Sequence, residues 1–178
     1  MATETHTIAV IGAGQDGREF ACAALLAGYR TILEDVSDSR LDQVVGWIAS
    51  VDAEASSRLM LSRTVEDAVR EADLLIEAVA EEMEMKIEMF TIFDKFAKPG
   101  AIFASSSRRI PVAELAGVTF CPERCIGMRL VCLAGREQIE LVRTRQTSEY
   151  TVAACREVLR RMGKEVTIVH EIELTESR

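Results

Sequence analysis

Short, almost continuously apolar segments alternate with amphipathic segments along the chain, and this alternation restricts the fold more than any other feature. The apolar segments are of strand length: residues 6–12, 29–35, 73–79, 101–106, 125–131, 138–142 and 165–170. Between them lie segments with helical periodicity: residues 15–28, 39–51, 65–72, 82–98, 112–116 and 148–163. Strands that are apolar on both faces need helices on both sides of their sheet. We therefore predict an α/β fold with a doubly wound, mostly parallel sheet, as a single domain over residues 1–178.

Composition limits the function classes. Hydrophobic residues make up 48% and charged residues 28% of the chain, which is typical of a globular protein. The net charge of −8 argues against nucleic acid as a partner, because binding to phosphates needs clustered Lys and Arg. The apolar segments are too short to cross a bilayer, and the first residues lack the pattern of a secretion signal. These features predict a cytoplasmic protein that binds neither nucleic acid nor membrane.

The five cysteines are odd in number and scattered along the sequence. Cys121 and Cys125 have a ligand-like spacing, but no second pair of Cys or His residues accompanies them. We therefore expect reduced thiols and no metal site.

Three glycines follow the first predicted strand with G-x-G-x-x-G spacing: Gly12, Gly14 and Gly17. They open a predicted helix, and Asp35 ends the second strand, which is the context of a dinucleotide-binding loop. Gly12 would permit the tight turn, Gly14 the approach of a pyrophosphate, and Gly17 the packing of the helix on the strand. Asp35 would accept hydrogen bonds from the ribose and repel a 2′-phosphate, which favours NAD over NADP. Alternatively, the glycines only shape a turn and bind nothing.

Asp16 lies in the first turn of the helix after these glycines, close to where a pyrophosphate is expected. We expect it to point to solvent or to pair with Arg18. If its carboxylate points inward, it weakens cofactor binding.

With these features in place, the chain resembles the NAD-binding domain of 3-hydroxyacyl-CoA dehydrogenases almost from end to end. The matching segments include "IAVIGAGQDGREFACAALLAGYRTILEDVS", "AVREADLLIEAVAEEMEMKIEMFTIFDKFAKPGAIFASSS", "CPERCIGMRL" and "TSEYTVAACREVLRRMGKEVTIV". The segment "DLLIEAVAEEMEMK" separates this family from other dinucleotide-binding folds. The resemblance implies a Rossmann-type domain that uses NAD to interconvert 3-hydroxyacyl-CoA and 3-ketoacyl-CoA in fatty acid metabolism.

The resemblance also implies cofactor-site residues. Ala78 and Glu81 match positions along the cofactor, and Lys86 matches one near the nicotinamide ribose. Ser106 takes the position of the asparagine in the family's S-N-T-S-S segment, and we assign it to the cofactor site as well. Spacing alone leaves open that Glu81 merely begins a helix and that Lys86 is its surface neighbour.

The catalytic positions depart from the family. Its strand after the P-E-R motif ends in G-M-H-F-F-N-P, where the histidine is the general acid and base and the asparagine helps to hold the substrate. Here these positions hold Arg129 and Cys132, and Arg108 replaces a substrate-contacting serine. Glu140 matches the glutamate that orients the histidine, so the catalytic candidates are Glu140, Arg129 and Arg108. An arginine does not give up its proton in proteins, so proton transfer is lost and the reaction should slow by about two to four orders of magnitude.

Two roles are open for Arg129. It can form an ion pair with Glu140, which we favour because a buried unpaired arginine is costly. Alternatively, it can join Arg108 and Arg109 in a site for the carboxylate or phosphate of a small substrate.

The family's substrate-binding parts are reduced as well. The stretch between Asp35 and Asp73 is shorter than in typical members, which place a CoA-contacting helical hairpin there. We expect the fold to lack the family's helical C-terminal domain, and Ser177-Arg178 takes the place of the family's final N-R motif.

Two functions from different classes follow. The first is an oxidoreductase-type NAD(H)-binding protein that acts weakly on a small anionic or acyl substrate. The second is a pseudoenzyme: a non-catalytic NAD-sensing or protein-interaction module on the same fold. The sequence leaves the oligomeric state open. A homo-oligomer would have to form through the surface of this domain.

Overall fold

The computed structural model describes residues 5–133 and 136–171. These residues build one eight-stranded sheet in the order β3-β2-β1-β4-β5-β6-β7-β8. The strands are β1 (Thr7–Ile11), β2 (Arg30–Glu34), β3 (Leu59–Ser62), β4 (Leu74–Glu77), β5 (Ile102–Ser105), β6 (Cys125–Leu133), β7 (Arg136–Arg143) and β8 (Glu165–His170). The pairs from β3 to β6 are parallel, β6 and β7 are antiparallel, and β8 runs parallel to β7. The predicted mostly parallel sheet is therefore confirmed. Ser177 and Arg178 lie outside the described residues.

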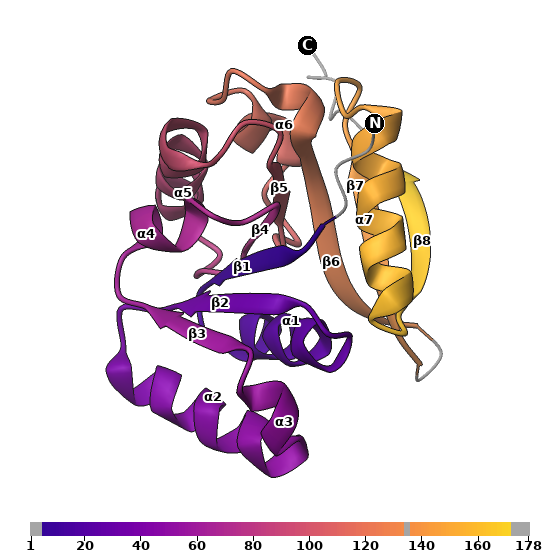
Figure 1. Cartoon of the computed structure of the whole chain (residues 1–178). Coiled ribbons are helices and arrows are strands. Elements are labelled where there is room, and N and C mark those ends of the chain that lie inside the picture. The colour runs from indigo at the N-terminus through magenta and orange to yellow at the C-terminus, as the bar shows by residue number, and fades with distance from the viewer. Residues whose placement is uncertain (1–4, 134–135, 172–178) are drawn as a thin grey trace.

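Helices cover both faces of this sheet (Figure 1). They are α1 (Gln15–Leu26), α2 (Asp38–Val51), α3 (Ala53–Ser56), α4 (Val65–Val69), α5 (Met83–Phe96), α6 (Val112–Ala116) and α7 (Glu149–Arg161), with a 3-10 turn, η1 (Pro122–Arg124). One core packs α1, α2, α3 and α7 against the sheet. The second core packs α4, α5 and α6 against the other face. The fold is thus doubly wound, as the continuous apolar strands predict.

A glycine and a capping residue mark two of the helix boundaries. The helix α1 ends just before Gly28, whose φ of 90° lies in the left-handed region that glycine adopts without strain. The side chain of Thr64 accepts a hydrogen bond from the Asp67 N–H and caps α4. The structure adds α3 and β3, which the sequence pattern does not predict.

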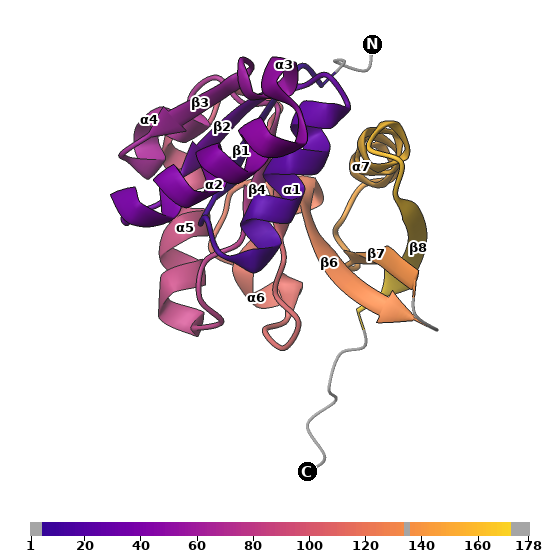
Figure 2. The ribbon, with the colours of Figure 1, turned by 90° about the horizontal axis from the view of Figure 1, so that it is seen from below.

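The last three strands form a distinct end of the sheet. The strand β6 curves away from the first five strands, and β7 and β8 continue from it beside α7 (Figure 2). The α7 side chains Val152, Cys155 and Leu159 are buried in the first core. The opposite face of these strands carries Arg129, Val142 and Val169, which line a pocket.

The order of the first six strands reverses between β1 and β4, because β2 lies on one side of β1 and β4 on the other. In open α/β sheets, ligands bind at the carboxyl ends of the strands beside such a reversal. The loops after β1 and β4 meet there, since the Gly12 backbone lies against the Ala78 carbonyl. This edge is where the candidate site is built.

Candidate functional site at the carboxyl edge of the sheet

The loop after β1 is closely packed and needs two of its glycines. Gly12 has a φ of 103°, and a Cβ on it would lie 2.6 Å from the Ala78 carbonyl oxygen. A Cβ on Gly17 would lie 1.8 Å from the carbonyl oxygen of Gly12, so α1 packs directly on the loop. Both positions therefore have the backbone roles that the G-x-G-x-x-G spacing predicts.

Gly14 differs from the other two glycines. A Cβ on it would meet no heavy atom within 4 Å, and it precedes α1 with no side chain capping the helix. The first turn of a helix offers unpaired N–H groups and a partial positive charge to an anion. The open side of Gly14 thus fits a dinucleotide diphosphate, and this contact stays a prediction.

Asp35 is buried and ties the glycine loop to the turn after β2. Its Oδ2 accepts hydrogen bonds from the Ala13 N–H at 2.8 Å and from Nη1 of Arg40 at 3.0 Å. Its Oδ1 accepts the Ser37 N–H at 2.8 Å. A carboxylate has about four acceptor positions, so about one remains on Oδ1 for a ribose hydroxyl. Arg40 was not a candidate from the sequence, although a cation five residues after a predicted cofactor acid was a visible signal.

Asp16 makes neither of its expected contacts. Its carboxylate pairs with the guanidinium of Arg108 at 3.2 Å, although the two residues are far apart in sequence. Arg18 instead lies over the ring of Trp47, with 5.6 Å between its Cζ and the ring centroid. The pair of Asp16 and Arg108 joins the start of α1 to the loop after β5, across the carboxyl edge.

A buried ion pair supports the loop after β4. The ammonium group of Lys86 lies 2.6 Å from Oε1 of Glu77, and both side chains are 0% exposed. The hydroxyl of Ser105 donates to Oε2 of Glu77, and the Val79 N–H donates to Oε1. Burial raises the pKa of Glu77, and Lys86 together with these donors opposes the rise. Removing one member of such a pair typically costs about 3–5 kcal/mol.

The Lys86 side chain is held against this loop. Its ammonium donates to Glu77 and to the Val79 carbonyl, and its side chain is fully buried. Its predicted place near a nicotinamide ribose stays a prediction. Lys86 is not a surface neighbour of Glu81.

Glu81 links the loops after β4 and β5. Its Oε1 accepts hydrogen bonds from the Ser107 hydroxyl and from the N–H groups of Arg109 and Ile110. Burial alone would raise the pKa of Glu81, but these donors and Lys86 outweigh it and lower the pKa. Glu81 is therefore an anion that fixes the loop around Ser107.

Ala78 and Ser106 lie where β4 and β5 end. The Ala78 N–H donates to the Ile11 carbonyl at 2.8 Å, and the Ser106 N–H donates to the Glu77 carbonyl at 2.9 Å. Both residues are thus held beside the glycine loop by backbone hydrogen bonds. Their predicted contacts with a cofactor stay predictions.

Arg129 on β6 lies directly opposite Glu140 on β7 in the antiparallel pair. The two residues therefore face one another across the strands, as the family's histidine–glutamate pair would. However, Nε of Arg129 donates to the carbonyl oxygen of Ser107 at 2.7 Å, and no ion pair forms between these two described side chains. The predicted ion pair is wrong, because the guanidinium donates instead to the backbone of the loop after β5.

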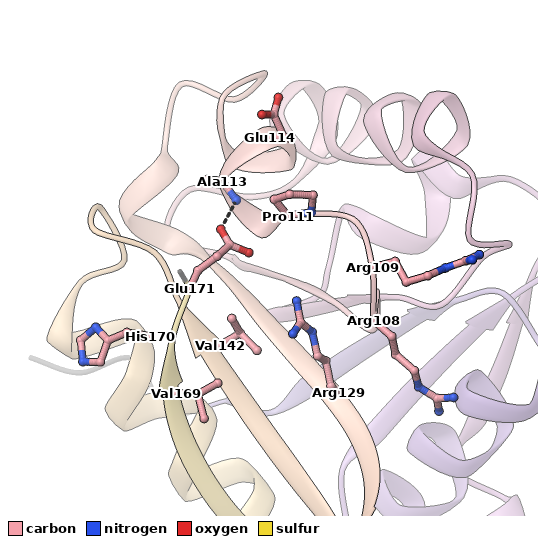
Figure 3. A pocket seen from close by; sticks show the side chains of 10 residues that line it. All are labelled: Arg108, Arg109, Pro111, Ala113, Glu114, Arg129, Val142, Val169, His170 and Glu171. Carbon is pink, nitrogen blue, oxygen red and sulfur yellow. Dashed lines mark hydrogen bonds between the residues drawn. The ribbon is translucent and has the colours of Figure 1, made fainter. Parts of the chain in front are cut away.

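A pocket of about 630 Å³ opens beside Arg129. Figure 3 shows Arg129 pointing from β6 toward Pro111 and Glu171, while the ends of Arg108 and Arg109 extend away from it. The three guanidinium groups of the alternative anion site therefore do not converge. The residues that line the pocket are Arg108, Arg109, Pro111, Ala113, Glu114, Arg129, Val142, Val169, His170 and Glu171.

Glu171, just after β8, closes one wall of this pocket. Its carboxylate oxygens accept the N–H groups of Val112 at 2.6 Å and Ala113 at 2.8 Å, at the start of α6. Figure 3 shows the bond to Ala113. Neither Glu171 nor His170 was a candidate from the sequence, because nothing local connects β8 with α6. Glu171 is committed to the helix, and Figure 3 shows the His170 ring turned away from Arg129.

The remaining predicted features concern thiols, metals and membranes. All five cysteines are free thiols: Cys132 is exposed, and Cys22, Cys121, Cys125 and Cys155 are buried. Within residues 5–133 and 136–171, no group of three or more His, Cys, Asp or Glu side chains is arranged to hold a metal ion. No helix in the same part of the chain is long and apolar enough to span a membrane.

Comparison with known proteins places this geometry in a family. The profile of the 3-hydroxyacyl-CoA dehydrogenase NAD-binding domain matches residues 7–172. A 3-hydroxybutyryl-CoA dehydrogenase of Bradyrhizobium diazoefficiens is 33% identical over 94% of the chain, which covers 62% of that protein. A probable 3-hydroxybutyryl-CoA dehydrogenase of Bacillus subtilis is also 33% identical, with 94% of the chain and 63% of that protein covered. The chain thus spans less than two thirds of these relatives.

Solved structures of 3-hydroxyacyl-CoA dehydrogenases have the same fold. The (S)-3-hydroxybutyryl-CoA dehydrogenase of Ralstonia eutropha superposes with a TM-score of 0.87 at 27% identity, covering 95% of this chain and 65% of that one. A 3-hydroxyacyl-CoA dehydrogenase of Archaeoglobus fulgidus gives a TM-score of 0.82 at 29% identity, covering 95% of this chain and 58% of that one. The chain therefore belongs to the NAD-binding domain family of the 3-hydroxyacyl-CoA dehydrogenases, whose cofactor is NAD.

Proposed function

We propose that the chain binds NAD(H) across the glycine loop and the loops after β4 and β5, with weak or no 3-hydroxyacyl-CoA dehydrogenase activity. The observation that carries this proposal is that the cofactor part of the site is retained, whereas the position of the catalytic acid and base is altered. The loop after β1 has the open Gly14 and the buried Asp35 that a dinucleotide needs. The position of the proton-transferring histidine holds Arg129, whose Nε is bound to the Ser107 carbonyl.

A bound nicotinamide would exchange a hydride with the substrate, and this chain's residues would have to take up the hydroxyl proton on oxidation and return it on reduction. Arg129 can polarise a substrate carbonyl, because a guanidinium is a fixed positive charge with several N–H donors. It cannot cycle a proton near neutral pH. The pocket's other titratable side chains are Glu114, His170 and Glu171. Of these, Glu171 caps α6 and the His170 ring points away from Arg129.

The cofactor half is tested by a fluorescence titration of the purified chain with NADH. We expect saturable binding that is lost in Asp35→Ala and in Gly14→Val. Asp35→Ala also removes a support of the glycine loop, so Gly14→Val is the sharper variant, because a Cβ at this position meets no heavy atom within 4 Å. Gly46→Ala, on the exposed face of α2, is the matched control and should bind NADH normally. Failure of the wild-type chain to bind NADH at millimolar concentration would overturn this half.

The catalytic half is tested with Arg129→His, in reactions containing NAD and 3-hydroxybutyryl-CoA, the substrate named for the relatives. We expect this variant to exceed the wild-type rate by at least about tenfold, because general acid/base catalysis contributes about 10²–10⁴-fold. Arg129→Gln removes the charge without adding a titratable group and should stay inactive. Wild-type turnover equal to that of Arg129→His would show that the arginine does not limit the reaction.

A second candidate is a non-catalytic NAD-sensing or interaction module. The pair of Asp16 and Arg108 favours it, because it commits a residue at the substrate serine position to a contact with α1. This candidate predicts NADH binding with no turnover in the wild type or in Arg129→His. The same two experiments therefore separate the candidates.

A further inference from the structure

A second cavity, of about 340 Å³, lies between the glycine loop and α2. One wall is the loop of residues 13–15 and the start of α1, and the other is the face of α2. The lining residues are Ala13, Gly14, Gln15, Arg18, Arg40, Gln43, Val44 and Trp47. They include two arginines and two glutamines and no carboxylate, so the cavity is positively charged and rich in donors.

The negative charge of Asp35, next to this cavity, is largely compensated, so it repels an anion less than a free carboxylate would. Asp35 lies against Arg40 at 3.0 Å and also accepts two backbone N–H groups. An acid at this position disfavours a 2′-phosphate through its negative charge, whereas an arginine nearby accommodates it. Here the acid and the arginine form one neutral pair, and the Arg40 side chain is 55% exposed on the side of the solvent.

Arg40 keeps donors for a second partner. A guanidinium carries five N–H groups, and the bond to Asp35 engages Nη1. Its other N–H groups suit bidentate contact with a phosphate. Arg18 supplies a second positive charge to the same cavity, held in place over the ring of Trp47.

We propose that this cavity receives the 2′-phosphate of NADP(H), so that the chain binds the 2′-phosphorylated dinucleotide as well as NAD(H), with Arg40 as the specificity-determining residue. Arg40 is bound to the same carboxylate that would hold the ribose, so a phosphate on that ribose would lie near its guanidinium. The inference rests on the proposed cofactor site and goes against the exclusion of NADP that Asp35 alone predicts.

The test compares fluorescence titrations of NADH and NADPH on the full chain. We expect the two dissociation constants of the wild type to lie within about tenfold of one another. Arg40→Ala should weaken NADPH binding by about tenfold or more, the size of a charge-assisted hydrogen bond, and should change NADH binding much less. Arg40→Gln keeps a donor for Asp35 and should show the same selective loss. Arg63→Ala, which removes a more exposed charge outside the cavity (85% against 55% for Arg40), should change neither.

Competition with adenosine nucleotides tests whether the 2′-phosphate itself contacts Arg40. Adenosine 2′,5′-bisphosphate should displace NADPH at a concentration well below that of 5′-AMP, and this difference should vanish in Arg40→Ala. NADPH binding more than about a hundredfold weaker than NADH binding would overturn the inference and leave the proposed function intact. Equal NADPH binding by the wild type and both Arg40 variants would remove Arg40 from the site and overturn it too. Binding of neither dinucleotide would overturn both proposals.

Discussion

At the scale of single residues, three acids near the carboxyl edge have different electrostatic surroundings. Asp35 accepts three donors, and Glu77 is paired with Lys86. Glu34, at the end of β2, is buried, and its burial, followed by the charges of Asp35 and Glu66, raises its pKa to about 7. Glu34 therefore changes its charge near neutral pH, directly beside the residue that is expected to hold the ribose.

This titration predicts a pH-dependent stability. The folded pKa of Glu34 lies above its ordinary value of 4.5, so the folded state binds the proton more tightly than the unfolded state. Its contribution to the free energy of unfolding is therefore fully present below about pH 4.5 and is lost as the pH rises to about 7, by up to about 3 kcal/mol. Glu34→Gln should remove this loss in urea unfolding at pH 5 and pH 8. An unchanged difference between the two pH values would assign the effect to other groups.

The negative charge of Asp16 should affect the affinity for NADH. Its carboxylate lies in the first turn of α1, where a diphosphate would be repelled, and it also holds Arg108. Asp16→Asn should strengthen NADH binding by about two- to tenfold, because an exposed charge contributes up to about 1 kcal/mol. Asp42→Asn, the same change on an exposed position of α2, is the control for net charge. Weaker binding in Asp16→Asn would mean that the pair with Arg108 is needed to shape the site.

At the scale of elements, the glycine loop and α1 behave as one packed unit. The contact of Gly17 with the Gly12 carbonyl leaves no room for a side chain, while Gly46 in α2 faces open space. The two positions are both helical glycines and differ only in what surrounds them. The difference between them therefore measures packing rather than helix propensity.

Alanine substitutions at these two glycines should have opposite effects. Gly17→Ala should lower the free energy of unfolding by at least about 3 kcal/mol, or prevent folding, because its Cβ would overlap backbone. Gly46→Ala should raise it by about 0.5–1 kcal/mol through helix propensity alone. Urea unfolding of both variants, followed by circular dichroism, measures the pair. Equal effects would show that the loop can move away from α1.

Most elements could be predicted from the sequence, because strands that are apolar on both faces and helices with an apolar stripe leave a strong periodic signal. The strand β3 left none: it has four residues at the edge of the sheet, and Met60 and Leu61 are half-exposed there. The glycine loop and Asp35 were predictable because their roles depend on the local backbone. The partners of Asp16 and Arg129 were not, because each is supplied by the loop after β5, which only the tertiary fold brings close.

At the scale of the whole molecule, two candidate regions lie on different parts of the sheet. The first five strands carry the expected dinucleotide site, and the loop after β5 with β6, β7 and β8 surrounds the pocket beside Arg129. The matched relatives are longer than this chain, so their substrates are not assigned to it. The oligomeric state and the cytoplasmic location stay predictions.

The reactivity of the cysteines reports how tightly the whole molecule is packed. Cys132 is exposed, and the other four are buried, with burial raising the pKa of Cys125 and of Cys155 to about 12. A thiol reagent at pH 8 should therefore modify one cysteine rapidly and the other four only after unfolding, because the thiolate is the reactive form. Cys132→Ser should abolish the rapid phase. Several rapidly reacting thiols in the wild type would show that the two cores open readily.

The ion pairs around the site also differ in how they respond to ionic strength. Arg40 and Arg108, which hold Asp35 and Asp16, are more than half exposed, whereas Lys86 and Glu77 are excluded from solvent. Dissolved ions screen exposed charges at about 10 Å in 0.1 M salt and act much less on buried ones. A rise in salt concentration should therefore loosen the two exposed pairs, at Asp35 and at Asp16, while the loop after β4 stays fixed. The ionic environment would then act on this edge mainly through its two arginine pairs and hardly through the buried pair below it.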